Sequence, residues 1–302
     1  MKQKIDVIEV GPRDGFQSVK CAQITTEQKL KVIDDLVAAG VKHLEYTSFV
    51  SPKAIPQLAD AKDVTEAVLK KYPDLDLFAL VPNLRGAQNA YELGLRKVCY
   101  VVSLSVSHNK ANINRTHEQS LEAYKEIRAA YPDLDVIVDL ATTFGCPFEG
   151  KYEDPAALVA FLKDYADAGM TTCCLCDTIG IADPAQVKAV IAAVKEAYPS
   201  LELMVHFHDT RGLGMVNTMA AIESGVTKIQ SALGGLGGCP FAPGASGNLS
   251  TEDMVWMLNE MGYDTGISFS KLLAAAKDQV KVIAGNYSGH HINVEAETPC
   301  KA

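Results

Sequence analysis

Several features that would mark a membrane or secreted protein are missing from this sequence of 302 residues. No apolar run approaches the roughly 18 residues that a membrane-spanning helix needs. Residues 1–10 lead directly into a short apolar stretch and lack the long apolar region and cleavage site of a signal peptide. The eight cysteines have neither the density nor the spacing of a disulfide scaffold. These absences predict a cytoplasmic protein that does not bind a membrane.

Positive charge is also scarce, because 28 Lys and Arg residues face 37 Asp and Glu residues and leave a net charge of −9. This balance argues against nucleic acid as a partner, although local basic residues can still bind an anionic small molecule. Linkers rich in Pro, Gly or Ser are absent, and 48% of the residues are apolar, as in a globular protein with a large core. We expect residues 1–302 to form a single catalytic domain, with a C-terminal helix and tail from about residue 268.

Two kinds of segment alternate along the chain. Short β-branched or apolar runs predict strands at 4–10, 43–48, 75–81, 97–105, 135–143, 171–178, 201–209 and 228–235. Stretches with helical periodicity occupy 26–40, 60–72, 83–94, 116–131, 155–169, 184–198, 215–225 and 251–262. This alternation predicts a closed (β/α)8 TIM barrel with an extra C-terminal helix at 268–285. A doubly wound open sheet is the alternative, but it rarely needs eight such regular units.

In a barrel of this kind the active site lies at the C-terminal ends of the strands. His206 and His208 end the seventh predicted strand, and residues i and i+2 of a strand face the same way. Two imidazoles facing the interior would form half of a metal site, whereas the alternative is a pair of hydrogen-bonded core histidines. We favour metal ligation because both histidines lie at the end of one strand.

The first strand ends in Arg13 and Asp14, which a common turn with a surface ion pair would also explain. At the mouth of a barrel, however, Asp14 offers the carboxylate that a hard cation needs, and Arg13 offers stabilisation of an oxyanion. The amide oxygen of Asn248 completes a set of Asp14, His206, His208 and Asn248. Oxygen and imidazole ligands without a thiolate favour Mg²⁺ or Mn²⁺, with Zn²⁺ or Co²⁺ as alternatives.

The eighth strand leads into a loop at 233–248 that contains six glycines. Such a loop suits a lid or a close approach to a ligand, and it lacks the Gly-Lys-Ser/Thr ending of a phosphate-binding loop. Cys239 lies in this loop, where a thiol can act as an acid or base or be a bystander. Glu45 and Asp177 add carboxylates near the mouth, as site residues or as groups that orient them. The cysteines at 173–176 lie within a strand, so we expect them to pack as small apolar side chains.

Seven segments carry a resemblance to a known family. They are EVGPRDGFQ at 9–17, TSFVSPK at 47–53, NINRT at 112–116, GCPFEG at 145–150, DTIG at 177–180, HFHDTRG at 206–212 and GGLGGCPFAPGASGN at 234–248. The sequence resembles the metal-dependent acyl-CoA lyases and synthases that use an α/β barrel. Within this family it is most similar to the 3-hydroxy-3-methylglutaryl-CoA lyases, from about residue 4 to 275. The synthases do not share the glycine-rich loop.

The resemblance implies a mechanism and a role for each residue. The metal ligands would be Asp14, His206, His208 and Asn248, and the catalytic or supporting groups would be Arg13, Glu45, Asp177, His206 and Cys239. The reaction would be a retro-Claisen cleavage of the acyl-CoA to acetyl-CoA and acetoacetate, with a base near Cys239 and with Arg13 stabilising the thioester enolate. The expected partner is therefore a small acyl-CoA molecule, and we expect the chain to form a homodimer.

Three positions depart from the family pattern and concern the substrate rather than the metal. Ala54 and Val106 stand where the family usually has Trp and Glu, and Cys176 interrupts a usual Leu-Gly-Asp. If Ala54 and Val106 line the acyl pocket, we expect it to accept a larger and more apolar acyl group.

The alternatives to a 3-hydroxy-3-methylglutaryl-CoA lyase are a lyase for a related 3-hydroxyacyl-CoA or hydroxy acid, a condensing synthase, and a ligand-binding barrel without catalytic activity.

Overall fold

The computed structural model describes residues 2–19, 24–238 and 247–294. Eight parallel strands close into a barrel in the order β1-β10-β9-β8-β5-β4-β3-β2. They are β1 (Asp6–Glu9), β2 (His43–Ser48), β3 (Asp76–Leu80), β4 (Lys97–Ser103), β5 (Asp135–Ala141), β8 (Thr172–Asp177), β9 (Glu202–Phe207) and β10 (Lys228–Ser231). Because β1 pairs with both β2 and β10, the sheet has no open edge there. The prediction of a closed TIM barrel is confirmed, and the open-sheet alternative is excluded.

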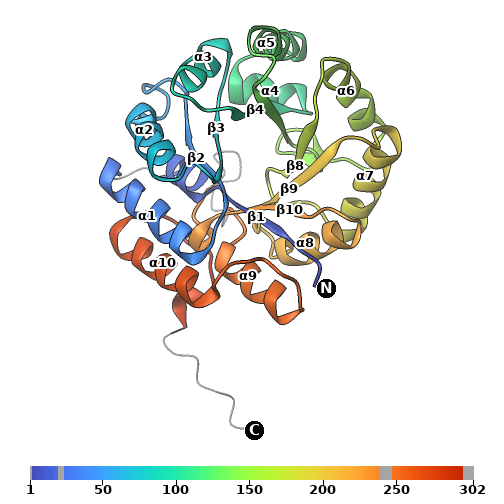
Figure 1. Ribbon diagram of the computed structural model, residues 1–302. Helices are drawn as coiled ribbons and strands as arrows, with labels where there is room; N and C mark the ends of the chain where they lie inside the picture. Colours follow the sequence, from blue (N-terminus) through green and yellow to red (C-terminus); the bar gives the residue numbers. More distant parts are fainter. Residues whose placement is uncertain (1, 20–23, 239–246, 295–302) are drawn as a thin grey trace.

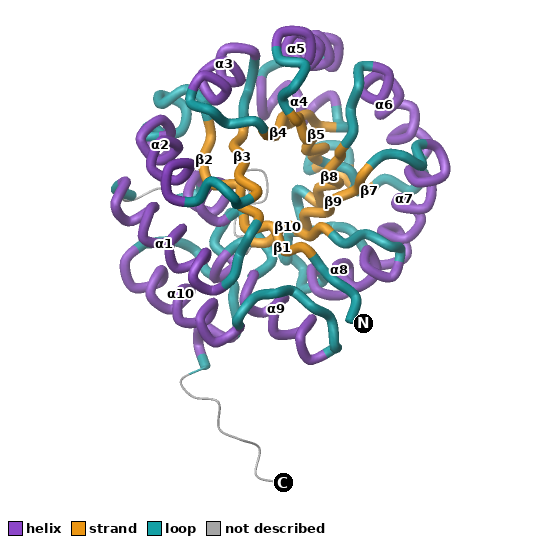
Figure 2. Tube along the Cα trace, viewed as in Figure 1, coloured by secondary structure: helices purple, strands orange, loops and turns teal. Residues whose placement is uncertain are grey.

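Helices surround the barrel on all sides (Figures 1 and 2). The predicted ones are α1 (Thr26–Ala39), α2 (Ala61–Lys71), α3 (Leu84–Glu92), α5 (His117–Ala130), α6 (Ala156–Asp167), α7 (Pro184–Ala197), α8 (Gly214–Glu223) and α9 (Thr251–Glu260). Several begin at capping residues, as in α1, where Thr25 and Gln28 form a capping box. The extra C-terminal helix is α10 (Phe269–Val282), which lies beside α1 (Figure 1) and whose Val282 carbonyl accepts a hydrogen bond from Gln28. Among the described helices, none is long and apolar enough to cross a membrane.

The sequence patterns missed several short elements. Helix α4 (Val106–Ile113) follows β4, and a small hairpin of β6 (Gly145–Cys146) and β7 (Gly150–Lys151) follows β5. Helix α4 has little apolar periodicity, and its first residue, Val106, is 63% exposed. Its start is fixed by the Ser105 hydroxyl, which accepts a bond from the His108 N–H. Three single-turn 3₁₀ helices, η2 (Pro56–Leu58), η3 (Leu233–Gly235) and η4 (His291–Asn293), complete the described chain.

The barrel interior and the layer between strands and helices have separate apolar cores. The interior core contains Ile8, Val10, Phe78, Leu80, Cys99, Ile137, Cys174, Cys176, Met204 and Ala232. Cys173 packs in the outer core, so the cysteines of β8 alternate between the two faces of the strand. Burial raises the pKa of Cys173 and of Cys174 well above the usual thiol value, so both stay neutral. The prediction that they pack as apolar side chains is confirmed.

Candidate metal and active site

Three of the predicted metal ligands meet at the C-terminal end of the barrel. Asp14 follows β1, His206 lies near the end of β9, and His208 lies just beyond it. One potential ligand atom from each lies within 4.8 Å of the others. The two imidazole rings have their centroids 5.1 Å apart, as expected for residues i and i+2 of one strand. The three residues therefore lie close together, as their positions at strand ends predicted.

A tight turn after β1 positions Arg13 and Asp14. Residues Gly11–Gly15 form a π-helical turn, η1, in which the Val10 carbonyl accepts bonds from the N–H groups of Arg13 at 3.1 Å and Asp14 at 2.7 Å. Glycine is needed at its start because a Cβ on Gly11 would lie 2.5 Å from a carboxylate oxygen of Glu9. π-helical turns occur frequently at functional sites. Here the turn directs consecutive charged side chains into the barrel mouth.

Asn248 reaches the same cluster from the end of the glycine-rich loop. Its amide Nδ2 donates to Asp14 Oδ2 at 2.7 Å and to the Leu236 carbonyl at 3.1 Å. Its Oδ1 is buried and accepts no hydrogen bond from the described residues. The loop can approach this closely because Gly237 has no side chain, since a Cβ there would lie 2.7 Å from Nδ2. A buried amide oxygen that lacks a hydrogen-bond donor needs another partner, and a metal ion would provide one.

The protonation states of Asp14, His206 and His208 also favour binding of a cation. His206 Nδ1 lies 2.9 Å from Gln230 Oε1, so Nδ1 carries the proton and Nε2 keeps its lone pair. Burial lowers the pKa of His206, and burial followed by repulsion from His206 lowers that of His208 to about 4. Burial alone would raise the pKa of Asp14, but the charge of Arg13, the two imidazoles and the hydrogen bond from Asn248 together outweigh burial and lower the pKa to about 2. One carboxylate and two neutral imidazoles fit a divalent metal.

Arg13 links the cluster to Glu45 on β2. Its Nε and Nη2 bind the two Glu45 carboxylate oxygens, with 2.7 Å for the Nη2–Oε2 pair, while Nη1 binds Asp14 Oδ1 at 2.6 Å. Glu45 is fully buried and Arg13 is 6% exposed. A bidentate pair of this kind fixes the plane of the guanidinium. Described residues accept bonds from three of the five N–H groups of Arg13, which leaves two for a substrate oxygen.

The remaining predicted site residues are placed differently. Asp177 ends β8, but its carboxylate accepts bonds from the N–H groups of Ile181 at 2.9 Å and Ala182 at 3.0 Å. It therefore holds the loop after β8 rather than joining the metal cluster, and burial raises its pKa to about 6. Cys239 lies outside the described residues. Ala54 and Val106 are exposed, whereas Cys176 faces the barrel interior, so an effect of the first two on the acyl pocket stays a prediction.

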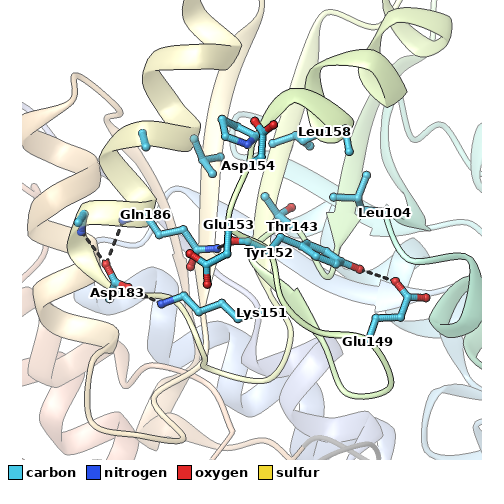
Figure 3. Close-up of a pocket in the computed structure, with 15 residues that line it drawn as sticks. Leu104, Thr143, Glu149, Lys151, Tyr152, Glu153, Asp154, Leu158, Asp183 and Gln186 are labelled. Atoms are coloured by element: carbon cyan, nitrogen blue, oxygen red, sulfur yellow. Dashed lines mark hydrogen bonds and ion pairs between the residues drawn. The ribbon is translucent and has the colours of Figure 1, made fainter.

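A cavity of about 740 Å³ lies between α6, α7 and the β6–β7 hairpin. Figure 3 shows hydrogen bonds and ion pairs among the residues that line it. Lys151 pairs with Asp183, and Tyr152 donates to Glu149 at 2.9 Å. Gln186 donates to the carbonyls of Phe144 and Tyr152. None of the metal cluster lines this cavity, so we place the chemistry at the barrel mouth and not here.

Glu9 was not among the predicted site residues, but its carboxylate connects the loops of the site by hydrogen bonds. Its Oε1 accepts bonds from the N–H groups of Gly11 at 2.7 Å and Leu233 at 2.8 Å, and its Oε2 accepts one from the Thr251 hydroxyl at 2.6 Å. It thereby joins the turn that carries Asp14 to the loop that precedes Asn248. An acidic residue at the end of an apolar strand was the signal available in the sequence.

The buried carboxyl of Glu9 gives a testable pH dependence. Burial outweighs its three hydrogen bonds and raises its pKa from 4.5 to about 7. The folded state therefore keeps this proton to higher pH than the unfolded state, so its contribution to stability is complete below about pH 4.5 and is lost as the pH rises towards 7. The shift corresponds to a loss on the order of 3 kcal/mol. Glu9→Gln should remove this loss, because an amide does not ionise.

Urea unfolding at pH 5 and pH 8 measures this effect in wild type, in Glu9→Gln and in the exposed control Glu66→Gln. We expect the wild type and the control to lose more stability than Glu9→Gln between the two pH values. Equal losses in all three proteins would show that Glu9 does not titrate in this range.

Comparison with known proteins identifies the family of this chain. The HMGL-like family model matches residues 4–278. Hydroxymethylglutaryl-CoA lyase YngG of Bacillus subtilis is 41% identical over 277 residues, which cover 91% of this chain and 92% of that protein. The human mitochondrial hydroxymethylglutaryl-CoA lyase is 39% identical, with 91% and 84% covered.

Solved structures give the same result. The HMG-CoA lyase from Acinetobacter baumannii in complex with coenzyme A and 3-methylmalate has a TM-score of 0.90 and 38% identity, covering 98% of this chain and 96% of that one. The Bacillus subtilis HMG-CoA lyase has a TM-score of 0.89 and 39% identity, covering 96% and 97%. The chain therefore belongs to the HMGL-like family and is an enzyme, a carbon–carbon lyase.

Proposed function

We propose that the chain cleaves 3-hydroxy-3-methylglutaryl-CoA to acetyl-CoA and acetoacetate in a reaction that depends on Mg²⁺ or Mn²⁺. The observation that carries this proposal is the Asp14, His206 and His208 cluster beside Arg13 at the barrel mouth. The substrate follows from the relatives, because those at 38–42% identity are named hydroxymethylglutaryl-CoA lyases. We also infer a single catalytic domain, whereas the homodimer and the cytoplasmic location stay predictions.

Asp14, His206, His208 and Asn248 would hold the metal. A divalent cation there would act as a Lewis acid towards the oxygens of the substrate. The preference for Mg²⁺ or Mn²⁺ rests on two oxygen ligands, from Asp14 and Asn248, and on the lack of a thiolate among these four residues. Gln230 supports this arrangement, since its hydrogen bond fixes which nitrogen of His206 faces the cluster.

The chain's own residues account for the proton and electron movements. A base near Cys239 removes the proton of the tertiary hydroxyl of the substrate. The electron pair of that O–H bond forms the ketone of acetoacetate as the C2–C3 bond breaks, and the electrons of that bond pass to the thioester as an enolate. The two uncommitted N–H groups of Arg13 stabilise the enolate oxygen, and protonation at C2 then gives acetyl-CoA.

We expect Cys239 to act in the chemical step. If its thiol exchanges a proton with the substrate, Cys239→Ala should lower kcat by about 100-fold or more while KM stays within about threefold. Steady-state kinetics measures both values. The matched control is Cys300→Ala, which removes another thiol outside the described residues and should leave kcat unchanged. A kcat within about threefold of wild type for Cys239→Ala, roughly 0.7 kcal/mol in the barrier, would make the thiol a bystander.

A coupled assay of acetyl-CoA release tests the function as a whole. The purified chain is supplied with Mg²⁺ or Mn²⁺ and with a panel of 3-hydroxyacyl-CoA thioesters and free hydroxy acids. We expect cleavage of 3-hydroxy-3-methylglutaryl-CoA, and none without metal. Faster cleavage of another thioester would favour the related lyase, condensation of acetyl-CoA would favour a synthase, and binding without turnover would favour a ligand-binding barrel.

A further inference from the structure

Asp139, on β5, is a buried acid inside the barrel to which the proposed mechanism gives no role. In the parallel register it pairs with Val101 of β4 and with Cys174 of β8. Paired residues of neighbouring strands face the same side of a sheet, and Cys174 belongs to the interior core, so Asp139 also points inward. Strand β5 is four positions from β1 and two from β9 in the closed order, so Asp139 lies across the barrel from Asp14 and nearer to the strand of His206.

The carboxyl of Asp139 lacks a complete set of partners. It is 4% exposed, and its Oδ1 makes no hydrogen bond to any described residue. The thiol of Cys99 lies within hydrogen-bonding reach of both Asp139 and Glu45, but it has only one proton, which it donates to Glu45 Oε1 at 3.0 Å. Burial raises the pKa of Cys99 well above the usual thiol value, so that proton is not lost. A buried carboxylate oxygen left without a donor is unusual enough in a folded protein to require a cause.

A second metal site does not explain this group. Ligand atoms of Glu45, Cys99 and Asp139 lie within 4.8 Å of one another. Both oxygens of Glu45, however, already bind the guanidinium of Arg13. A cation would therefore find only the carboxyl of Asp139 and a protonated thiol, next to an existing positive charge. The unfilled hydrogen-bonding capacity of Asp139 is better suited to a neutral polar group of a ligand.

The side chains around Asp139 form a mostly apolar wall. Val101 is partly exposed, and Cys176 and Leu80 are each 9% exposed, so these inward-facing residues remain accessible from the mouth. An acyl group that extends from the metal cluster into the barrel would meet this wall and the carboxyl of Asp139. Burial, followed by repulsion from Glu45, raises the pKa of Asp139 to about 7, so both the acid and the carboxylate are populated near neutral pH. A hydroxyl can donate to the carboxylate and accept from the acid, so it suits both states.

We propose that Asp139 contacts the acyl group of the substrate and selects a C3 substituent that carries a hydroxyl over a hydrocarbon substituent of equal size. This inference rests on the proposed lyase function. A second carboxylate on the substrate would suit this place less well, because Asp14, Glu45 and Asp139 already surround the single guanidinium of Arg13. A substrate that leaves a buried polar group of the enzyme unpaired is rejected more strongly than one that only lacks a methylene.

The test compares three thioesters that differ only at C3, namely the methyl parent, the ethyl analogue and the hydroxymethyl analogue. Ethyl and hydroxymethyl have the same number of heavy atoms, so their ratio of kcat/KM reports polarity and not size. We expect wild type to prefer hydroxymethyl over ethyl by about tenfold or more. Asp139→Leu, of similar shape, should lower this ratio to about one or below, and Asp139→Asn should retain it within about threefold.

The outcomes separate the two proposals. If wild type cleaves the methyl parent but prefers ethyl to hydroxymethyl, the inference fails whether or not the variants fold. An equal ratio in wild type and in a folded Asp139→Leu, with kcat lowered alike for all three thioesters, would make Asp139 a structural partner of Arg13 and Glu45 and would also overturn it. Failure of wild type to cleave any of the three would overturn the proposed function as well. Calorimetric titration with Mn²⁺ establishes that each variant keeps its metal site.

Discussion

Replacing His208 or Asp14 by alanine should abolish metal binding and turnover while leaving the barrel folded. Loss of a group that merely orients a metal ligand typically costs 10- to 100-fold in affinity, so loss of a ligand should cost about 100-fold or more. Without the metal, the barrier should rise by several kcal/mol and kcat should fall on the order of 1000-fold or more. His208→Ala should fold normally, because Nδ1 of His208 makes no hydrogen bond to the described residues.

Calorimetric titration with Mn²⁺ measures the affinity, and thermal unfolding of the metal-free proteins measures the fold. The matched control for metal affinity is His290→Ala, which removes an imidazole that is 83% exposed and contacts Asp253 rather than the cluster, and which should leave the affinity for Mn²⁺ unchanged. Chelation of the metal from wild type should likewise stop turnover, and added Mn²⁺ should restore it. Unchanged metal affinity in both His208→Ala and Asp14→Ala would rule out this site.

The strands were predictable because each is a short apolar run that a barrel buries on both faces. The prediction at 135–143 became β5 (Asp135–Ala141), and that at 43–48 matched β2. Helix α4 was not predicted, because its start depends on one hydroxyl, that of Ser105, rather than on apolar residues at helical spacing. Local capping contacts of this kind do not produce a pattern that extends over many residues.

The site was partly predictable for a similar reason. His206, His208 and Asp14 lie at strand ends, and the closed barrel brings all strand ends to one face, so sequence position alone indicated their proximity. The bidentate pairing of Arg13 with Glu45 could not be foreseen, because it depends on the π-helical turn after β1. Asp139 interrupts the apolar run of β5, but only the register with β4 and β8 shows that it faces inward.

The pairing of Arg13 with Glu45 leads to a second prediction of large effect. Arg13→Lys keeps a positive charge but replaces a planar fork of five donors with a point charge that has three. Lysine cannot bind both oxygens of Glu45, reach Asp14 and still present two N–H groups to an enolate. Removing one donor to a developing oxyanion typically lowers kcat by about 100- to 1000-fold. We expect a decrease of this size, with the affinity for Mn²⁺ within about threefold of wild type, because Arg13 is not a ligand.

Kinetics of acetyl-CoA release and calorimetric titration with Mn²⁺ measure the two quantities separately. Arg96→Lys is the matched control, because Arg96 immediately precedes β4, at the opposite end of the barrel, and bonds to the carbonyls of Tyr91 and Leu95. It should change kcat by less than about twofold. If Arg13→Lys lowers metal affinity and kcat by the same large factor, Arg13 acts by holding Asp14 in place. If kcat is unchanged, the enolate is stabilised by another group and the role proposed for Arg13 is wrong.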